Sequence, residues 1–195
     1  MSPTVRPAPS ALPQNVLDLK GGALGGAMRE ELFLKQGGGW FRIVSGSMVP
    51  LLAIGDRVYA RHVPPCEIKV GDIALFKHGS IFVTHRVIGF LENGAGTLML
   101  QKGDAASAAD LVDIRCVMGK VELIDKKGKL VRLDRGLGRA VNALLALRGR
   151  WDYRFREAAR RAVSLPPGSR LRDALRLSNR ALSRLNNGMV RRLLG

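Results

Sequence analysis

The chain has 195 residues, with an apolar fraction of 46% and a charged fraction of 25%. These values are typical of one globular domain with appendages and argue against a largely disordered protein. The formal net charge of +16 favours an anionic partner (nucleic acid, an acidic lipid surface or an acidic protein), although a basic soluble surface is an equally good explanation. The two cysteines, Cys66 and Cys116, have no Cys-x-x-Cys spacing, so neither a metal site nor a disulfide framework is expected.

No apolar stretch reaches the ~20 residues that span a bilayer, and residues 1–14 lack the charged start and apolar run of a secretory signal. We therefore expect a cytoplasmic or peripheral membrane protein. Residues 1–39 are rich in proline and glycine and are predicted to form a flexible lead-in. They contain one short helix over residues 28–35, which Gly37-Gly38-Gly39 ends.

Residues 40–132 are predicted to be mostly β. Short apolar, β-branched runs alternate with turn signals such as Glu92-Asn93-Gly94 and Lys127-Gly128. The expected strands cover residues 40–44, 57–63, 72–77, 81–91, 97–102, 116–125 and 129–133. Several short strands joined by hairpin-type turns favour a folded antiparallel sheet or barrel over a parallel sheet with crossover helices.

Residues 133–195 are predicted to form a basic helical extension. Residues 132–195 contain sixteen arginines and four acidic residues, which accounts for most of the net charge. Leucines recur at helical spacing, and Arg172, Arg176, Arg180 and Arg184 repeat every four residues along one helix face. Three interpretations stay open for this face: a solvated surface, an amphipathic helix lying on an anionic membrane, or a site for nucleic acid phosphates.

The central region also carries a candidate nucleophile and base. Ser47 follows an apolar run in a glycine-flanked turn, His85 lies in a strand-like segment, and Asp104 follows a glycine further on. A serine hydroxyl becomes a useful nucleophile when a neighbouring base takes its proton and a third group orients that base. The chain supplies the three types of residue in the order Ser, His, Asp. In an isolated Ser-Gly-Ser, however, the serine more commonly bonds its own backbone in a turn.

The remaining histidines and two aspartates have simpler interpretations. His62 precedes a Pro-Pro loop and His78 precedes Gly79 in a predicted turn, so both are expected on the solvated surface. Asp56 and Asp72 each follow a glycine at the start of a strand, where aspartate normally organises a turn.

Five sequence blocks together resemble the signal peptidase I superfamily, in the Ser-His branch of archaeal, endospore-former and endoplasmic-reticulum enzymes. The blocks are Ser45-Gly46-Ser47-Met48-Val49-Pro50, Gly55-Asp56, Gly71-Asp72-Ile73-Ala74-Leu75-Phe76, His85-Arg86-Val87-Ile88 and Lys102-Gly103-Asp104, all within residues 40–125. Blocks in the same order form a more specific signal than any one of them alone.

This resemblance implies a mainly β domain of the signal-peptidase and LexA-like type, with Ser47 as nucleophile and His85 as general base. It also implies catalytic acids at Asp104 and Asp110, and of these Asp110 is the favoured partner of His85. The Ser47 N–H and the Ser45 hydroxyl are the expected oxyanion donors. Gly46 is expected to permit a tight turn.

The implied activity is that of a serine endopeptidase that cuts after small side chains without a cofactor, its peptide substrate adding to an exposed strand edge. Three features depart from the family pattern: Val49 replaces a common acidic residue, Ala105-Ala106 replace common amides, and no transmembrane anchor precedes the serine block. The alternative is a LexA-like self-processing or non-catalytic regulator that binds nucleic acid or an acidic partner. Those relatives use a lysine as base, and residues 1–39 are poorly suited to a helix-turn-helix.

Overall fold

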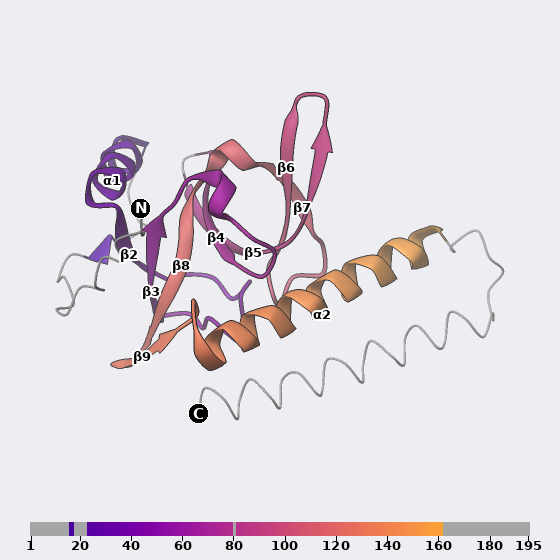
Figure 1. The fold of residues 1–195 in the computed structure, drawn as a ribbon. Helices are drawn as coiled ribbons and strands as arrows, with labels where there is room; N and C mark the ends of the chain where they lie inside the picture. Colours follow the sequence, from indigo (N-terminus) through magenta and orange to yellow (C-terminus); the bar gives the residue numbers. More distant parts are fainter. Residues whose placement is uncertain (1–15, 18–22, 80, 162–195) are drawn as a thin grey trace, which may run out of the picture.

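A computed structural model describes residues 16–17, 23–79 and 81–161 (Figure 1). Within them, one sheet of nine strands contains the order β1-β2-β3-β8-β4-β5-β6-β7, with β9 paired to β8. Only the pairing of β1 with β2 is parallel. The mainly β, antiparallel architecture predicted from the sequence is therefore confirmed. The elements are β1 Val16–Leu17, α1 Ala23–Gln36, β2 Gly38–Arg42, β3 Arg57–His62, β4 Ile73–His78, β5 Ile81–Asn93, β6 Gly96–Lys102, β7 Asp110–Asp113, β8 Val117–Lys126, β9 Lys129–Arg132 and α2 Gly136–Arg161, with short 3-10 turns at Pro65–Glu67 and Ile114–Cys116.

The turn between β8 and β9 shows how local sequence sets this topology. Lys126 and Lys129 pair across the hairpin, and the two residues between them, Lys127 (φ 53°) and Gly128 (φ 90°), both have a positive φ. Two positive φ angles are the signature of the tight turn that suits the right-handed twist of a hairpin. The Asp125 carboxylate accepts the Gly128 N–H at 2.7 Å and holds the turn closed.

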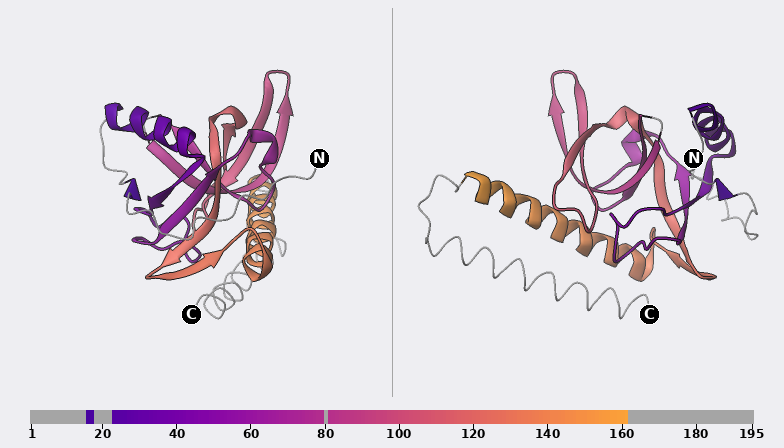
Figure 2. Two further views of the ribbon diagram at one scale, coloured as in Figure 1. Left: turned by 60° about the vertical axis from the view of Figure 1, so that its left-hand side comes forward. Right: turned by 180° about the vertical axis from the view of Figure 1, so that it is seen from behind.

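Helices α1 and α2 lie at separate places on the periphery of the curved sheet (Figure 2). Both contribute to its main core. Phe33 of α1 packs with Phe41 of β2, while Val141 and Leu145 of α2 belong to the same buried cluster. Burial of each such side chain contributes about 1.5–3 kcal/mol. The core thus extends past both boundaries, at residues 39 and 132, that the sequence analysis placed around the β region.

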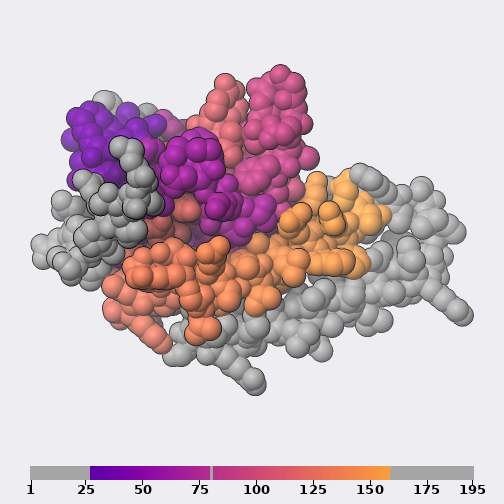
Figure 3. Space-filling view, in the orientation of Figure 1, coloured from indigo at the N-terminus to yellow at the C-terminus, as the bar shows by residue number. Residues whose placement is uncertain are grey.

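Helix α2 lies against the β domain, where it contacts β5 and β9 (Figure 3). Besides the apolar packing of Val141 and Leu145, a polar contact joins α2 to the β domain. Asp152 of α2 forms an ion pair with Lys102 of β6 at 3.0 Å; the Lys102 side chain is buried and the Asp152 side chain is 12% exposed. Arg172, Arg176, Arg180 and Arg184 lie outside the described residues, so the three interpretations of that face stay predictions.

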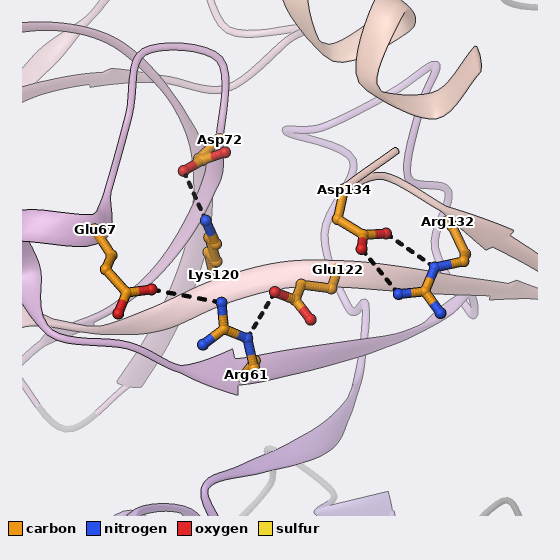
Figure 4. Close-up of polar contacts among 7 residues, drawn as sticks. All are labelled: Arg61, Glu67, Asp72, Lys120, Glu122, Arg132 and Asp134. Carbon is orange, nitrogen blue, oxygen red and sulfur yellow. Dashed lines mark hydrogen bonds and ion pairs between the residues drawn. The ribbon is translucent and has the colours of Figure 1, made fainter. Parts of the chain in front are cut away.

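A row of ion pairs covers the outer face of β3 and β8 (Figure 4). Arg61 of β3 donates to Glu122 of β8 at 2.7 Å and lies 3.6 Å from Glu67. Lys120, two residues before Glu122 and so on the same face of the strand, pairs with Asp72 at 3.5 Å. Arg132, the last residue of β9, pairs with Asp134 at 2.8 Å. Partly exposed pairs of this kind contribute at most about 1 kcal/mol each, so the core carries most of the stability.

The predicted strands correspond to β2, β3, β4, β5, β6, β8 and β9, and the predicted helix over residues 28–35 is the later part of α1. Strands β1 and β7 were not predicted. Among the described residues, none of the helices is long and apolar enough to cross a membrane.

Candidate active site

The segment after β2 places Ser47 at the surface while its neighbours are anchored below. Met48 is 1% exposed, and Leu51 and Leu52 are completely buried in the main core. Backbone hydrogen bonds join the start of the segment to the residues before β3. The Ile43 N–H donates to the Asp56 carbonyl at 2.8 Å, and the Ile43 carbonyl accepts from the Gly55 N–H. Ser47 therefore stands half-exposed on a turn that its own apolar neighbours fix to the core.

His85 lies on β5, directly opposite Ala74 of β4. Its Nε2 is 3.1 Å from Ser47 Oγ, although the two residues are 38 positions apart in the chain. This distance is within hydrogen-bond reach for a nucleophile and its base. The edge of the His85 ring also faces Phe76, at 6.2 Å between centroids, which leaves the ring less room to turn away. The structure therefore brings together the two residues on which the sequence interpretation depends.

The third member of the arrangement is Gln101 of β6. Its Oε1 is 2.5 Å from His85 Nδ1, and the Gln101 residue is only 5% exposed. A carbonyl oxygen only accepts hydrogen bonds, so His85 Nδ1 carries the proton and Nε2 presents its lone pair to the Ser47 hydroxyl. The contact therefore sets the tautomer that a general base needs.

This finding corrects the prediction that Asp110 or Asp104 orients His85. Asp110 is exposed, and its carboxylate accepts the N–H of Leu111 at 2.8 Å. It pairs with Gln101 across β6 and β7, so the predicted acid stands beside the orienting amide and not on the imidazole. Gln101 was not predicted because a neutral amide does not stand out in a sequence as a partner for histidine. The pairing of β5 with β6 brings it beside His85.

Asp104 instead forms a buried ion pair with Arg86. Arg86 Nε and Nη2 donate to the two carboxylate oxygens at 2.7 and 2.8 Å, and Arg86 is completely buried. The remaining guanidinium nitrogen, Nη1, donates to the Gly71 carbonyl at 3.0 Å and to Asn142 Oδ1 of α2 at 2.8 Å. Asp104 thus helps to hold β5, the loop after β6 and α2 together.

The same loop also supports the backbone of Ser47. Ala105 N–H donates to the Ser47 carbonyl at 2.9 Å. A Cβ at Gly103 would lie 2.6 Å from that carbonyl oxygen, so this close approach requires glycine. At Gly46, by contrast, a Cβ would meet only Val49 at 3.8 Å, and φ there is not positive. The chain does turn at Gly46, because the Val49 N–H donates to the Gly46 carbonyl at 3.2 Å, but this turn does not require glycine.

The surroundings of His85 favour its neutral form. Burial lowers the pKa of His85 below its ordinary value of 6.5, because a buried imidazole is poorly solvated when charged. The hydrogen bond to Gln101 and the charges of Asp104 and Asp110 act in the opposite direction but do not overcome this effect. At neutral pH the imidazole is therefore free to accept a proton.

Ser45 lies beside Ser47, with 3.4 Å between the two hydroxyl oxygens. This position is compatible with the predicted oxyanion role of its hydroxyl. Donation by Ser45 or by the Ser47 N–H to a developing oxyanion stays a prediction.

Ser47 and His85 stand at one end of a largely apolar cleft of about 230 Å³ between the 42–48 segment and the start of β5. Its apolar lining comprises Phe41, Ile43, Val44, Met48, Leu75, Ile81, Phe82 and Val83. Strand β6 pairs with β5 only from Arg86 onward, so no described strand pairs with residues 81–85 on the side away from β4. The cleft therefore contains an open strand edge that leads to the Ser-His pair.

The other polar residues considered in the sequence have structural environments. His78 is exposed; His62 is also exposed, and its Nδ1 lies 2.6 Å from the Met118 carbonyl oxygen. Asp56 and Asp72 accept backbone N–H groups of Ala53 and Lys69, the turn-organising role expected of them. Both cysteines are free and exposed, and the described residues contain no cluster of His, Cys, Asp and Glu suited to a metal.

Comparison with known proteins adds no family to this geometry. No protein-family model matches the chain. A search of curated proteins likewise finds no match.

Proposed function

We propose that this chain is a serine endopeptidase of the signal-peptidase type. The observation that carries the proposal is the 3.1 Å contact between Ser47 Oγ and His85 Nε2 at the end of an apolar cleft. A surface serine in an ordinary turn does not require a half-buried histidine with a fixed tautomer beside it. The five sequence blocks that resemble this superfamily give the same residues the same roles.

In the proposed reaction, Ser47 Oγ attacks the carbonyl carbon of the scissile peptide bond and its proton passes to His85 Nε2. Gln101 Oε1 accepts the hydrogen bond from His85 Nδ1–H and so holds the imidazole in place while positive charge develops on the ring. The tetrahedral intermediate collapses when His85 returns the proton to the leaving amine, which leaves an ester on Ser47. A water molecule, deprotonated by His85, then hydrolyses this ester and restores both side chains.

The open edge of β5 supports an extended peptide as the substrate class. Main-chain groups of residues 81–85 are available on the side away from β4, so a substrate strand adds to the sheet by ordinary β pairing. The apolar lining of the cleft suits an uncharged segment. Cleavage after a small residue is the part of the proposal that comes from the family resemblance alone.

Labelling with a fluorophosphonate probe, which reacts only with an activated serine, tests this proposal. Wild-type protein should be labelled, whereas Ser47→Ala and His85→Ala should both lose the label. The matched controls are Ser107→Ala and His78→Ala, which alter an exposed serine and an exposed histidine away from the pair. Equal labelling of Ser47→Ala and wild type, with both proteins folded by circular dichroism, would contradict the assignment.

The proposal implies a peptide or protein substrate, and an anionic membrane surface is the second partner suggested by the basic C-terminal part. We propose a cytoplasmic or peripheral membrane location on the same grounds. Co-sedimentation of the full chain with vesicles of anionic or zwitterionic lipid tests the membrane part. Equal sedimentation with both kinds of vesicle would contradict it.

A further inference from the structure

The largely apolar cleft contains two positive charges. Arg29 of α1 and Arg42 at the end of β2 line it together with apolar side chains, and no acidic residue lines it. Cations in such a place become costly once a bound peptide excludes water, unless an anion accompanies them. The cleft therefore contains a feature that peptide cleavage as such does not require.

The contact between Phe41 and Phe82 marks the end of the cleft that is remote from the Ser47–His85 pair. The rings of Phe41 and Phe82 lie 5.9 Å apart, while Ser47 and His85 meet at the other end. The three residue-to-residue steps from Phe82 to His85 on β5 span about 10 Å of extended chain. Arg42 directly follows Phe41 in the segment that lines the cleft, so its backbone lies about three or four residues of an extended substrate away from the Ser47–His85 pair.

Helix α1 places Arg29 at this same end. Phe33, one helical turn after Arg29, packs on Phe41 with 5.6 Å between ring centroids. The neighbouring Glu30 pairs with Lys77 of β4 at 2.6 Å, and Lys77 lies opposite Phe82 in the sheet. Two independent contacts thus fix the helix beside the Phe41–Phe82 end.

The carboxylates nearest in sequence are already engaged elsewhere. Glu30 pairs with Lys77, and Glu31 pairs with Lys35 at 2.7 Å. Within the part of the chain that the structure describes, neither Arg29 nor Arg42 has an ion-pair partner. By contrast, Arg57, Arg61, Arg86, Arg115, Arg132 and Arg156 are each paired with a carboxylate.

We propose that Arg29 and Arg42 form a subsite for a carboxylate side chain of the substrate, about three or four residues from the scissile bond. This inference rests on the proposed function, since it assumes a peptide seated along β5. The substrate is then an extended peptide that combines an apolar stretch with one acidic residue at this position. Charge-assisted hydrogen bonds to the guanidinium groups provide the recognition.

Two peptide series test the subsite. One carries a single glutamate moved residue by residue along an otherwise neutral sequence, and the other carries glutamine at the same positions. With wild-type protein, we expect kcat/KM for glutamate to exceed that for glutamine about tenfold at one position, three or four residues from the cleaved bond. This preference should weaken as salt rises, because the arginines are partly open to solvent.

Charge reversal sharpens the test. Arg42→Glu should invert the preference, so that a lysine peptide is cleaved faster than the glutamate peptide. Arg139→Glu on α2 makes the same charge change at an exposed site outside the cleft and should keep the wild-type preference. An Arg42→Glu protein that still prefers glutamate would overturn the subsite.

Binding to the Ser47→Ala protein separates failure of this inference from failure of the proposed function. Fluorescence anisotropy with the labelled glutamate and glutamine peptides measures recognition without cleavage, and the glutamate peptide should bind about tenfold more tightly. Equal binding overturns the subsite whether or not the wild type cleaves. If the probe does not label the wild-type protein, the proposed function is overturned, but the binding comparison between the two peptides still tests the subsite.

Discussion

His85 and Arg86 are consecutive residues of β5, yet they belong to two different polar systems. Strand geometry turns their side chains to opposite faces. His85 faces the cleft and contacts two uncharged groups, the Ser47 hydroxyl and the Gln101 amide. Arg86 faces the interior and binds Asp104 and Asn142. The face with the Ser47–His85 contact therefore uses uncharged groups, while the Arg86–Asp104 ion pair lies on the opposite face and joins structural elements.

This division has a physical basis. A buried guanidinium is tolerable only when nearly all of its donors are satisfied, and Arg86 meets this condition with a carboxylate, a backbone carbonyl and an amide. A neutral imidazole held by an amide needs no such compensation. We therefore expect changes on the Arg86 side to affect stability first, and changes on the His85 side to affect the rate and its pH dependence.

Arg86→Leu should produce the largest effect. It leaves the Asp104 carboxylate buried without its partner, which should cost about 3–5 kcal/mol in the free energy of unfolding. Urea denaturation followed by circular dichroism measures this change. Arg132→Leu, which removes a half-exposed pair, is the control and should shift the midpoint little. A similarly small shift for Arg86→Leu would remove the distinction between the two systems.

Gln101→Ala should come next and should act on the rate. Loss of the Nδ1 contact leaves the imidazole tautomer unfixed, and we expect kcat to fall on the order of a hundredfold with the fold retained. Peptide hydrolysis and thermal unfolding measured in parallel provide the check. A rate equal to that of wild type would show that Gln101 does not orient the base.

Gln101→Glu tests at the same position how a negative charge beside His85 changes the pH dependence of the rate. In the wild type, activity should fall with acid as His85 takes up a proton, through a pKa that burial holds below 6.5. A glutamate beside Nδ1 stabilises the imidazolium and raises the pKa of His85, so the acid limb of the pH–rate profile should move to higher pH. An unmoved limb would mean that another group controls it.

Asn142→Ala should have a smaller effect, again on stability. The amide joins α2 to Arg86 at 2.8 Å and donates to the Leu133 carbonyl at 3.2 Å. Removal leaves buried polar groups unsatisfied and should cost about 1–3 kcal/mol. Exposed Ala143 is next in sequence, and Ala143→Ser makes a mild matched control. Unchanged stability would mean that the apolar packing of Val141 and Leu145, and not Asn142, keeps α2 on the β domain.

Asp110→Asn should produce the smallest change. The carboxylate acts on His85 only through its charge, which raises the pKa of the imidazole. Its removal should therefore lower that pKa slightly and move the acid limb to lower pH, with kcat at neutral pH almost unchanged. A large loss of kcat would restore the catalytic role that the sequence assigned to this residue.

The sequence predicts the strands and the Ser47–His85 pair because both leave local signals. Alternating apolar residues mark strands, and the order of the blocks marks the pair. Strand β7 escapes such analysis, since an exposed segment that begins and ends with aspartate has little strand character. Gln101 and Asn142 escape it as well, because an amide acquires its role only from the residues that folding brings beside it.

The open edge of β5 has a consequence for the protein in concentrated solution. A row of unpaired backbone groups accepts any extended chain, including the same edge of a second copy. At high protein concentration, such self-association would compete with the peptide, and the apparent KM would rise with the amount of enzyme. The strand edge that we propose to receive the substrate would then also limit how concentrated a fully active preparation can be.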